Sequence, residues 1–539
     1  MEIENFNFEK YFSYEYGSAR WADTDEIIKN APTIKRINIA DEDCPGSGIP
    51  LISDGRIAYV DNSDTHSLIF GSTGSKKTRL FGMPLINFFG LAGESFIATD
   101  PKGELYDRTS GLVAAKGYKI VVLNFRDLYQ SDFWNPFALP YELYHGGKKD
   151  EAISLLNDFI NALADLQIKS AKDPYWILMG CSMALAYVLF FIDTATSAEA
   201  NITNFVDFFA SKSSENELEE LSRCVAAGSV ASINFNGILR LKGTTTTFNC
   251  VASEVTSMFN PFIIRKSLCQ VLSNSSFDVR DIGKEKTAIY IIIPDEKTTL
   301  HFLVTAFVKQ TYEALIQEAQ QQKDKKLPVR VNILLDEFGN IPRISDMASM
   351  ITAARSRNIR FFLLVQGMYQ MSNKYGKGDA ETIKANCDNI LYLVSREYDL
   401  LKEISSLCGD TYYKDNDGNL KTRALISISE LQRFSKERGE TLIIHGRNYP
   451  LVTELPDIDQ YNFKSYPQVS SNNNTLPQIV RYDANKVFYE IRNGKRPIPF
   501  SDEVSDETRY FEGQPARSND DLLWGNPSLK PANDDDWNW

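Results

Sequence analysis

The chain has 539 residues, of which 43% are hydrophobic and 12% aromatic, and its formal net charge is −13. This length and apolar content exclude a wholly disordered chain and predict a soluble globular protein of two or three domains. The seven cysteines are scattered without a C-x-x-C pair. That pattern argues against a disulfide framework or a zinc site and favours a reducing cytoplasm. The first residues lack the basic-then-apolar pattern of a secretion signal.

The acidic charge is concentrated at the C-terminus. Residues 501–539 contain ten acidic and three basic residues, so that −7 of the total charge lies there. The Asn, Asp and Pro content predicts a disordered acidic tail over residues 466–539. Two roles stay open for this tail: a solubilising end, or a docking peptide whose isolated aromatic residues anchor a basic partner. Since a local groove decides DNA binding, the net charge does not exclude nucleic acid.

Short apolar runs predict eight strands, most of them covered on both faces. In chain order the runs are HSLIFG (66–71), ESFIATD (94–100), YKIVVLNF (118–125), TAIYIIIP (287–294), VRVNILLDEF (329–338), RFFLLVQ (360–366), NILYLVS (389–395) and ETLIIHG (440–446). Between the third and fourth runs the apolar spacing becomes helical. The pattern therefore predicts an α/β nucleotide-binding domain that carries a largely α-helical insertion.

The predicted division has four parts: an N-terminal arm at 1–60, the nucleotide-binding domain at 61–143 and 262–465, the all-α insertion at 144–261, and the tail at 466–539. Within the insertion, ILMGCSMALAYVLFFI (177–192) is shorter than the roughly 20 residues that a bilayer helix needs. We expect a buried helix there and no transmembrane anchor.

The stretch GSTGSKKT nearly matches the phosphate-binding pattern G-x-x-x-x-G-K-[ST], with Lys76 at the last glycine position. A predicted strand precedes it and a helical pattern follows it, so its backbone N–H groups and the helix dipole would face phosphates. Lys77 would reach the β- and γ-phosphates of ATP and Thr78 would bind Mg²⁺. The candidate cofactor-binding residues are Gly71, Ser72, Thr73, Gly74, Ser75, Lys76, Lys77 and Thr78.

Two backbone conformations are open to Lys76. With φ below zero the residue fits without strain and adds a cation near the phosphates. With φ above zero a lysine strains the loop by roughly 1 kcal/mol or more. The remaining motifs favour a working ATPase in either case.

Polar side chains follow two later strands. The apolar run VNILL is followed by Asp336, which would complete the Mg²⁺ shell, and by Glu337, which would polarise the attacking water. Gln366 ends RFFLLVQ and is either a γ-phosphate sensor or a solvated strand end. Because parallel strands bring their carboxyl ends to one edge of a sheet, we expect these residues to meet the phosphate-binding loop.

The sequence resembles the type IV coupling proteins, the TraG/TraD-type ATPases of conjugative DNA transfer, over about residues 17 to 460. Six motifs carry this resemblance and occur in the order expected for the family. The motifs are YGSARWA, HSLIFGSTGSKKT, ATDPKGEL, FWNPF, LLDEFGNIPRI and ITAARSRNIRFFLLVQ. The resemblance implies a RecA-like P-loop NTPase domain with an inserted all-α domain. It also implies a homo-hexameric ring that uses ATP and Mg²⁺ to deliver DNA–protein substrates to a secretion channel.

The resemblance further implies that Arg355, in AARSRN, is an arginine finger acting on the neighbouring subunit; an exposed basic helix end is the alternative. The implied partners are DNA in the ring pore, a relaxase or accessory DNA-processing protein, and components of the type IV secretion channel. Members usually begin with membrane helices, and this chain does not, so we expect a cytoplasmic protein that a partner recruits to the inner face of the membrane.

Two other functions stay open from the sequence. One is a soluble RecA-like DNA translocase that works outside secretion, for example in defence. The other is an adaptor that uses nucleotide to set its conformation and docks DNA-processing proteins without pumping DNA.

Overall fold

The centre of the molecule is a nine-stranded sheet. The computed structural model describes residues 19–30, 32–241, 245–414, 417–470 and 475–501. The strand order is β14-β13-β10-β4-β9-β8-β5-β7-β6, and the strands from β10 to β6 are parallel. The strands are β4 (Ser67–Phe70), β5 (Ser95–Asp100), β6 (Lys119–Asn124), β7 (Thr287–Ile292), β8 (Val331–Leu335), β9 (Ile359–Val365), β10 (Asn389–Tyr392), β13 (Glu440–His445) and β14 (Leu451–Glu454).

All eight predicted strands are therefore confirmed, and the predicted α/β fold class is confirmed with them. Strand β14, which the apolar runs did not predict, pairs antiparallel with β13 at one edge of the sheet. A small antiparallel sheet of β1 (Ile34–Asn38), β2 (Ile49–Ser53) and β3 (Ile57–Asp61), also not predicted, lies within the predicted N-terminal arm.

The side chains of the central strands alternate between two covered faces. On β7, Ile289 and Ile291 join the core beneath α14 (His301–Gln321). Ala288 and Tyr290 join the opposite core with α3 (Met83–Ala92) and α4 (Glu104–Ala115). Burial on both faces explains why these strands are continuous apolar runs rather than alternating ones.

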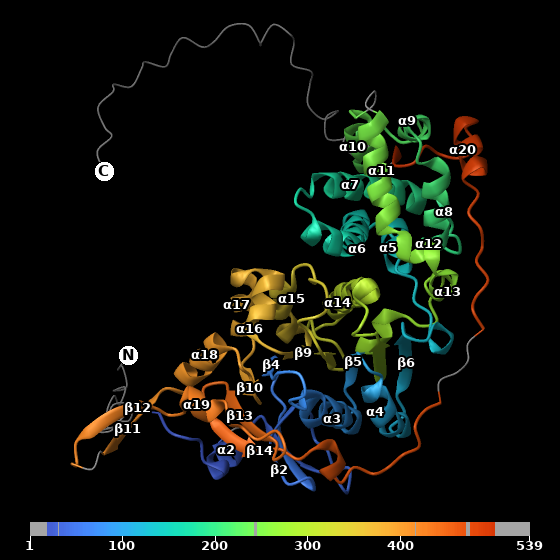
Figure 1. Cartoon of the computed structure of the whole chain (residues 1–539). Coiled ribbons are helices and arrows are strands. Elements are labelled where there is room, and N and C mark those ends of the chain that lie inside the picture. Colours follow the sequence, from blue (N-terminus) through green and yellow to red (C-terminus); the bar gives the residue numbers. More distant parts are fainter. Residues whose placement is uncertain (1–18, 31, 242–244, 415–416, 471–474, 502–539) are drawn as a thin grey trace, which may run out of the picture.

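Nine helices of the described chain follow β6 and precede β7, and they form a separate helical body (Figure 1). They are α5 (Ala138–His145), α6 (Lys149–Ser170), α7 (Tyr175–Thr194), α8 (Ile202–Lys212), α9 (Glu215–Arg223), α10 (Val230–Leu239), α11 (Thr245–Met258), α12 (Asn260–Ile264) and α13 (Lys266–Val271). Among the described residues, α7 alone has the length and hydropathy of a membrane span, and 67% of its most apolar window is buried inside the protein. A core helix passes the same test, so this is weak evidence for a span.

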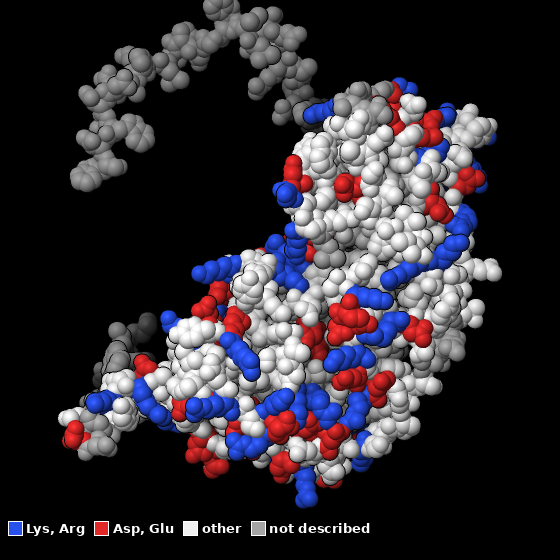
Figure 2. All heavy atoms as spheres, viewed as in Figure 1, with Lys and Arg blue, Asp and Glu red and all other residues white. Residues whose placement is uncertain are grey.

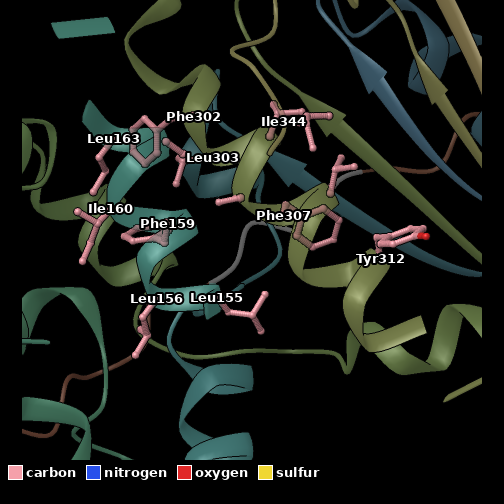
Figure 3. Packing of buried hydrophobic residues seen from close by; sticks show 14 of the residues in the cluster. Leu155, Leu156, Phe159, Ile160, Leu163, Phe302, Leu303, Phe307, Tyr312 and Ile344 are labelled. Carbon is pink, nitrogen blue, oxygen red and sulfur yellow. The ribbon is translucent and has the colours of Figure 1, made fainter. Parts of the chain in front are cut away.

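The helical body packs on the sheet through α6 and α14 (Figure 3). Phe159 of α6 meets Phe302 of α14 edge to face, with ring centroids 6.2 Å apart. Leu155 and Leu163 of α6 lie in the same buried cluster. Since each fully buried side chain of this size contributes about 1.5–3 kcal/mol, this interface fixes the helical body on the sheet.

The chain after β14 is a C-terminal strap, here defined as residues 461–470 and 475–501. Figure 1 shows it running along one side of the molecule from the sheet to the helical body. There α20 (Ala484–Arg492) packs, and Phe488 stacks on Phe190 of α7. This corrects the prediction that the tail is disordered from residue 466. The prediction was wrong because it treated helix α20 and the acidic end as one segment. Residues 502–539, which hold the proposed docking peptide, lie outside the described residues.

The remaining elements surround the carboxyl half of the sheet domain. They are α2 (Thr24–Asn30), α15 (Met347–Ala354), α16 (Met368–Tyr375), α17 (Lys377–Ala385), α18 (Tyr398–Cys408), α19 (Ile428–Leu431) and the hairpin of β11 (Asp410–Lys414) and β12 (Leu420–Ala424). All seven cysteines are free thiols. Figure 2 shows acidic and basic side chains interspersed over the sheet domain, with wide uncharged areas on the helical body.

Candidate nucleotide site

The loop Gly71–Thr78 lies at the carboxyl edge of the sheet, directly after the central strand β4. The Gly71 N–H donates to the Val365 carbonyl at 3.0 Å, and the Ser72 N–H donates to the Val394 carbonyl at 2.8 Å. These carbonyls end β9 and follow β10, the two neighbours of β4. The loop is therefore fixed from both sides.

Small residues are required inside the loop. A Cβ atom on Gly71 would lie 2.4 Å from Ser75 Oγ, so no side chain fits there. Gly74 has a φ of +75°, which glycine adopts without strain. Ser75 is 1% exposed, and its Oγ has no hydrogen-bond partner among the described residues. A buried unpartnered hydroxyl in a tight loop at a helix start fits a phosphate group, which supplies acceptor oxygens.

Lys77 and Thr78 face the end of β8. Lys77 Nζ donates to the Gly71 carbonyl at 2.6 Å and lies 3.9 Å from Glu337 Oε1. Burial lowers the pKa of Lys77, while Glu337 and Asp336 oppose that shift. Thr78 Oγ1 donates to Asp336 Oδ2 at 2.6 Å. The loop and the strand-ending acids, predicted to meet across more than 250 residues of sequence, are in direct contact.

Glu337 is held in place by neighbouring side-chain amides. Its Oε2 accepts hydrogen bonds from Gln366 Nε2 at 2.9 Å and from Asn340 Nδ2 at 3.3 Å. Its backbone φ is +52°, a left-handed conformation that costs a residue other than glycine of order 1 kcal/mol or more. Asp336 is 4% exposed, and burial raises its pKa. Gln366 therefore contacts the candidate catalytic acid and is not a free strand end.

Asp100 is a neighbour of this cluster that the sequence analysis did not select. It ends β5, and its Oδ2 accepts a hydrogen bond from the Tyr106 N–H at 2.9 Å. Burial, and to a lesser degree the negative charge of Asp336, raise its pKa to about 6. The position of ATDPKGEL at the end of a strand beside β8 was the signal for it.

Lys76 adopts the strained one of the two conformations considered above, with a φ of +66°. Its side chain also differs from the expectation of a cation near the phosphates. Lys76 Nζ lies 3.0 Å from Glu437 Oε2 and 3.8 Å from Asp457 Oδ2. The charge of Lys76 is therefore neutralised by carboxylates from the C-terminal part of the sheet domain.

Arg355 lies apart from the other predicted residues. It begins the short helix Arg355–Arg357 before β9, whereas Gln366 follows β9. A seven-residue strand spans roughly 23 Å, so Arg355 cannot reach the phosphate loop of its own subunit. Its side chain is 58% exposed, and Nη1 lies 3.4 Å from Asp388 Oδ2.

The residues present suit Mg²⁺ held jointly with a substrate. Among the described residues, no group of three or more His, Cys, Asp and Glu side chains could hold a metal ion alone. Thr78 Oγ1 and Asp336 Oδ2 offer two adjacent oxygen atoms. Mg²⁺ prefers this arrangement, in which one or two protein oxygens are completed by phosphate oxygens and water.

Comparison with known proteins assigns the chain to a family. A family model described as type IV secretory system conjugative DNA transfer matches residues 20–438, which contain every residue predicted for the site. The chain belongs to this family. The resemblance predicted from the six motifs is thereby confirmed.

Two curated relatives of the chain have low sequence identity to it. Protein VirD4 of Rhizobium radiobacter is 22% identical over 454 residues, which cover 80% of this chain and 62% of that protein. Protein VirD4 of Agrobacterium fabrum is 22% identical over 142 residues, which cover 26% of this chain and 21% of that protein. The chain thus spans about three fifths of the first relative's length.

Solved structures related to the conjugative DNA transfer family share the fold. The plasmid coupling protein TrwB in complex with ADP and Mg²⁺ has a TM-score of 0.54 at 13% identity, covering 85% of this chain and 99% of that one. TrwB with the ATP analogue ADPNP has a TM-score of 0.52 at 13% identity, covering 86% and 100%. This likeness shows that the sheet with its helical body is the TrwB architecture.

Proposed function

We propose that the chain is an ATP-dependent coupling protein that recruits DNA or DNA–protein substrates and helps move them to a type IV secretion channel. The contact of Lys77 and Thr78 with Asp336 and Glu337 carries the proposal, because a motor of this class needs these groups together. Family membership and the complexes of TrwB with ADP and an ATP analogue support it.

Each residue of the cluster has a role in the proposed hydrolysis. Lys77 would supply positive charge to the β- and γ-phosphates, and Thr78 and Asp336 would hold Mg²⁺, whose charge would offset that of the phosphate oxygens. Glu337 orients the attacking water and accepts its proton. Gln366 donates to Glu337 and so links the acid to the end of β9.

The proposal also includes the domain division of the chain, its oligomeric state and its partners. We divide the chain into the sheet domain, at about 61–143 and 262–465, and an inserted helical domain at about 144–261. This division counts α13 and most of α5 and α12, which lie at the two ends of the helical body's sequence, with the sheet domain. The working form is a homo-hexamer with DNA in its pore, and a relaxase or accessory protein and the secretion channel are its partners. The exposed Arg355, far from the site of its own subunit, suits a finger that acts across a subunit boundary.

The first test is ATP hydrolysis by the purified chain over a range of protein concentrations, with and without DNA. ATP turnover per subunit is expected to rise with protein concentration, because each active site is completed by Arg355 of a neighbouring subunit. Turnover is expected to rise further when DNA is added. Nucleotide binding without hydrolysis in any of these conditions would contradict the motor and favour the nucleotide-switched adaptor. DNA-stimulated hydrolysis without substrate transfer in a conjugation assay would favour a translocase outside secretion.

The second test mixes two inactive variants. Arg355→Ala removes the finger and Glu337→Gln removes the base, so each protein alone is expected to hydrolyse ATP poorly. In an equal mixture, about one interface in four combines an intact base with an intact finger, and hydrolysis is expected to return in part. Arg223→Ala removes a similarly exposed arginine from α9 and serves as the control, with turnover near wild type. No recovery in rings shown to be mixed would contradict the finger.

A further inference from the structure

Two cations flank the phosphate-binding pair Lys77 and Thr78, and both pair with one carboxylate. Lys76 precedes the pair, and its Nζ lies 3.8 Å from Asp457 Oδ2. Arg79 follows the pair, and its Nε donates to the same Oδ2 at 2.9 Å while Nη2 donates to Oδ1. Asp457 therefore contacts both sides of the loop segment that is proposed to bind phosphate and Mg²⁺.

The surrounding charges extend these contacts into a network around Asp457. Glu437 accepts from Lys76 at 3.0 Å, and Asp459 accepts from both Arg79 and Arg108. The Asp457 side chain is 17% exposed, compared with 57% for Asp459 and 71% for Glu437. The hydrogen bond from Arg79 lowers the pKa of Asp457, so this carboxylate is charged at neutral pH. Asp457 is the most buried acid of the network and its centre.

The backbone around Asp457 is itself fixed. Asp457 caps the short helix Ile458–Gln460, and the Asp457 N–H donates to the Gln460 side chain at 2.7 Å. Leu455 is buried in the core against the nine-stranded sheet, and Tyr461 is buried in the smaller core against the sheet of β1, β2 and β3. The carboxylate is thus presented from a rigid segment and can set the position of a loop.

We infer that Asp457 is a positioning residue for the nucleotide site: by pairing with Lys76 and Arg79 it holds the intervening Lys77 and Thr78 in their binding geometry. Lys76, which pairs with Asp457, has a left-handed backbone conformation and stands at the position where the phosphate-binding pattern has glycine. Asp457 lies beyond the family match, which ends at residue 438. The inference rests on the proposed ATP site, whose chemistry it does not change.

The test is Asp457→Asn. Asparagine caps helices as well as aspartate does, so the helix Ile458–Gln460 is retained and only the charge is removed. The affinity for a fluorescent ATP analogue with Mg²⁺ is expected to fall about tenfold, with KM for ATP rising in parallel and kcat changing less than about threefold. Asp459→Asn, two residues further on, removes a more exposed charge that does not pair with Lys76, and a loss below about threefold is expected.

A coupled pair of variants separates positioning from simple loss of charge. Asp457→Asn is combined with Lys76→Gly, which removes the flanking cation and accepts positive φ without strain. If Asp457 acts through the loop, its effect on affinity is expected to shrink in the Lys76→Gly background, which a double-mutant cycle detects. Asp457→Glu, which keeps the charge, is expected to recover part of the affinity.

The outcomes distinguish this inference from the proposed function. Wild-type protein that binds no nucleotide would overturn the ATP site, and the inference with it. Wild-type protein that binds nucleotide, with Asp457→Asn no weaker than Asp459→Asn, would overturn the inference alone. A fall in kcat at unchanged affinity would do the same, because it would place Asp457 in the chemical step. Urea unfolding of each variant confirms that the compared proteins are equally folded.

Discussion

Glu337→Gln is expected to leave ATP·Mg²⁺ binding near the wild-type level while lowering kcat by a factor on the order of 10² or more. Glutamine has the shape of glutamate and keeps an oxygen that can accept from Gln366 Nε2 and Asn340 Nδ2. It cannot take a proton from water at neutral pH. The variant therefore removes the proposed base and retains its surroundings.

The measurement is steady-state hydrolysis beside equilibrium binding of a fluorescent ATP analogue. Glu381→Gln serves as the control, because it neutralises an acid that is 50% exposed on α17 and pairs there with Lys384. Its kcat is expected to stay near wild type. Hydrolysis by Glu337→Gln at the wild-type rate would show that another group activates the water, and Asp100 at the end of the neighbouring strand would be the first candidate.

Lys77→Ala is expected to weaken ATP binding by a factor on the order of 10² or more, because it removes the buried cation that faces the phosphates. Lys77 is 5% exposed, burial lowers its pKa, and the nearest carboxylate is 3.9 Å away on Glu337, so its ammonium group is stabilised by a closer anion. A bound phosphate supplies that anion. The measurement is the dissociation constant for the same ATP analogue.

The adjacent lysine tests the register of the loop. Lys76→Gly removes a cation that pairs with Glu437 and Asp457, and it relieves the left-handed backbone at that position. We expect it to change affinity far less than Lys77→Ala does. If Lys76→Gly abolished binding and Lys77→Ala did not, the phosphate ligand would be Lys76 and the assignment would be wrong by one residue.

The parts of the fold that the sequence predicted are those with a local pattern. The eight strands were recognisable because burial on both faces makes each of them a continuous apolar run. The cluster of Lys77, Asp336 and Gln366 followed from strand ends, since parallel strands share one edge. The strands and the cluster could both be predicted because each strand is visible in a short window of residues and because parallel strands end at the same edge of a sheet.

The parts that were missed depend on contacts between distant segments. Lys76 and Asp457 are far apart in the sequence, and no local pattern shows that they pair. The left-handed φ of Lys76 is set by the loop as a whole. Helix α20 has an apolar face of Val487, Phe488 and Ile491, but its window is short and polar on average, so composition assigned it to the tail.

The strap contacts both the helical body and the sheet domain, in addition to the interface of α6 with α14 and the two chain crossings at the ends of the insertion. Tyr482 packs its ring on Phe191 and shares a hydroxyl contact with Thr194, and the Pro499 carbonyl accepts from the Ala226 N–H. At its other end, the Tyr466 hydroxyl donates to Glu42. Movement of the helical body against the sheet therefore has to break the contacts between α6 and α14, and the strap adds contacts of Tyr466 on one side and Tyr482 on the other.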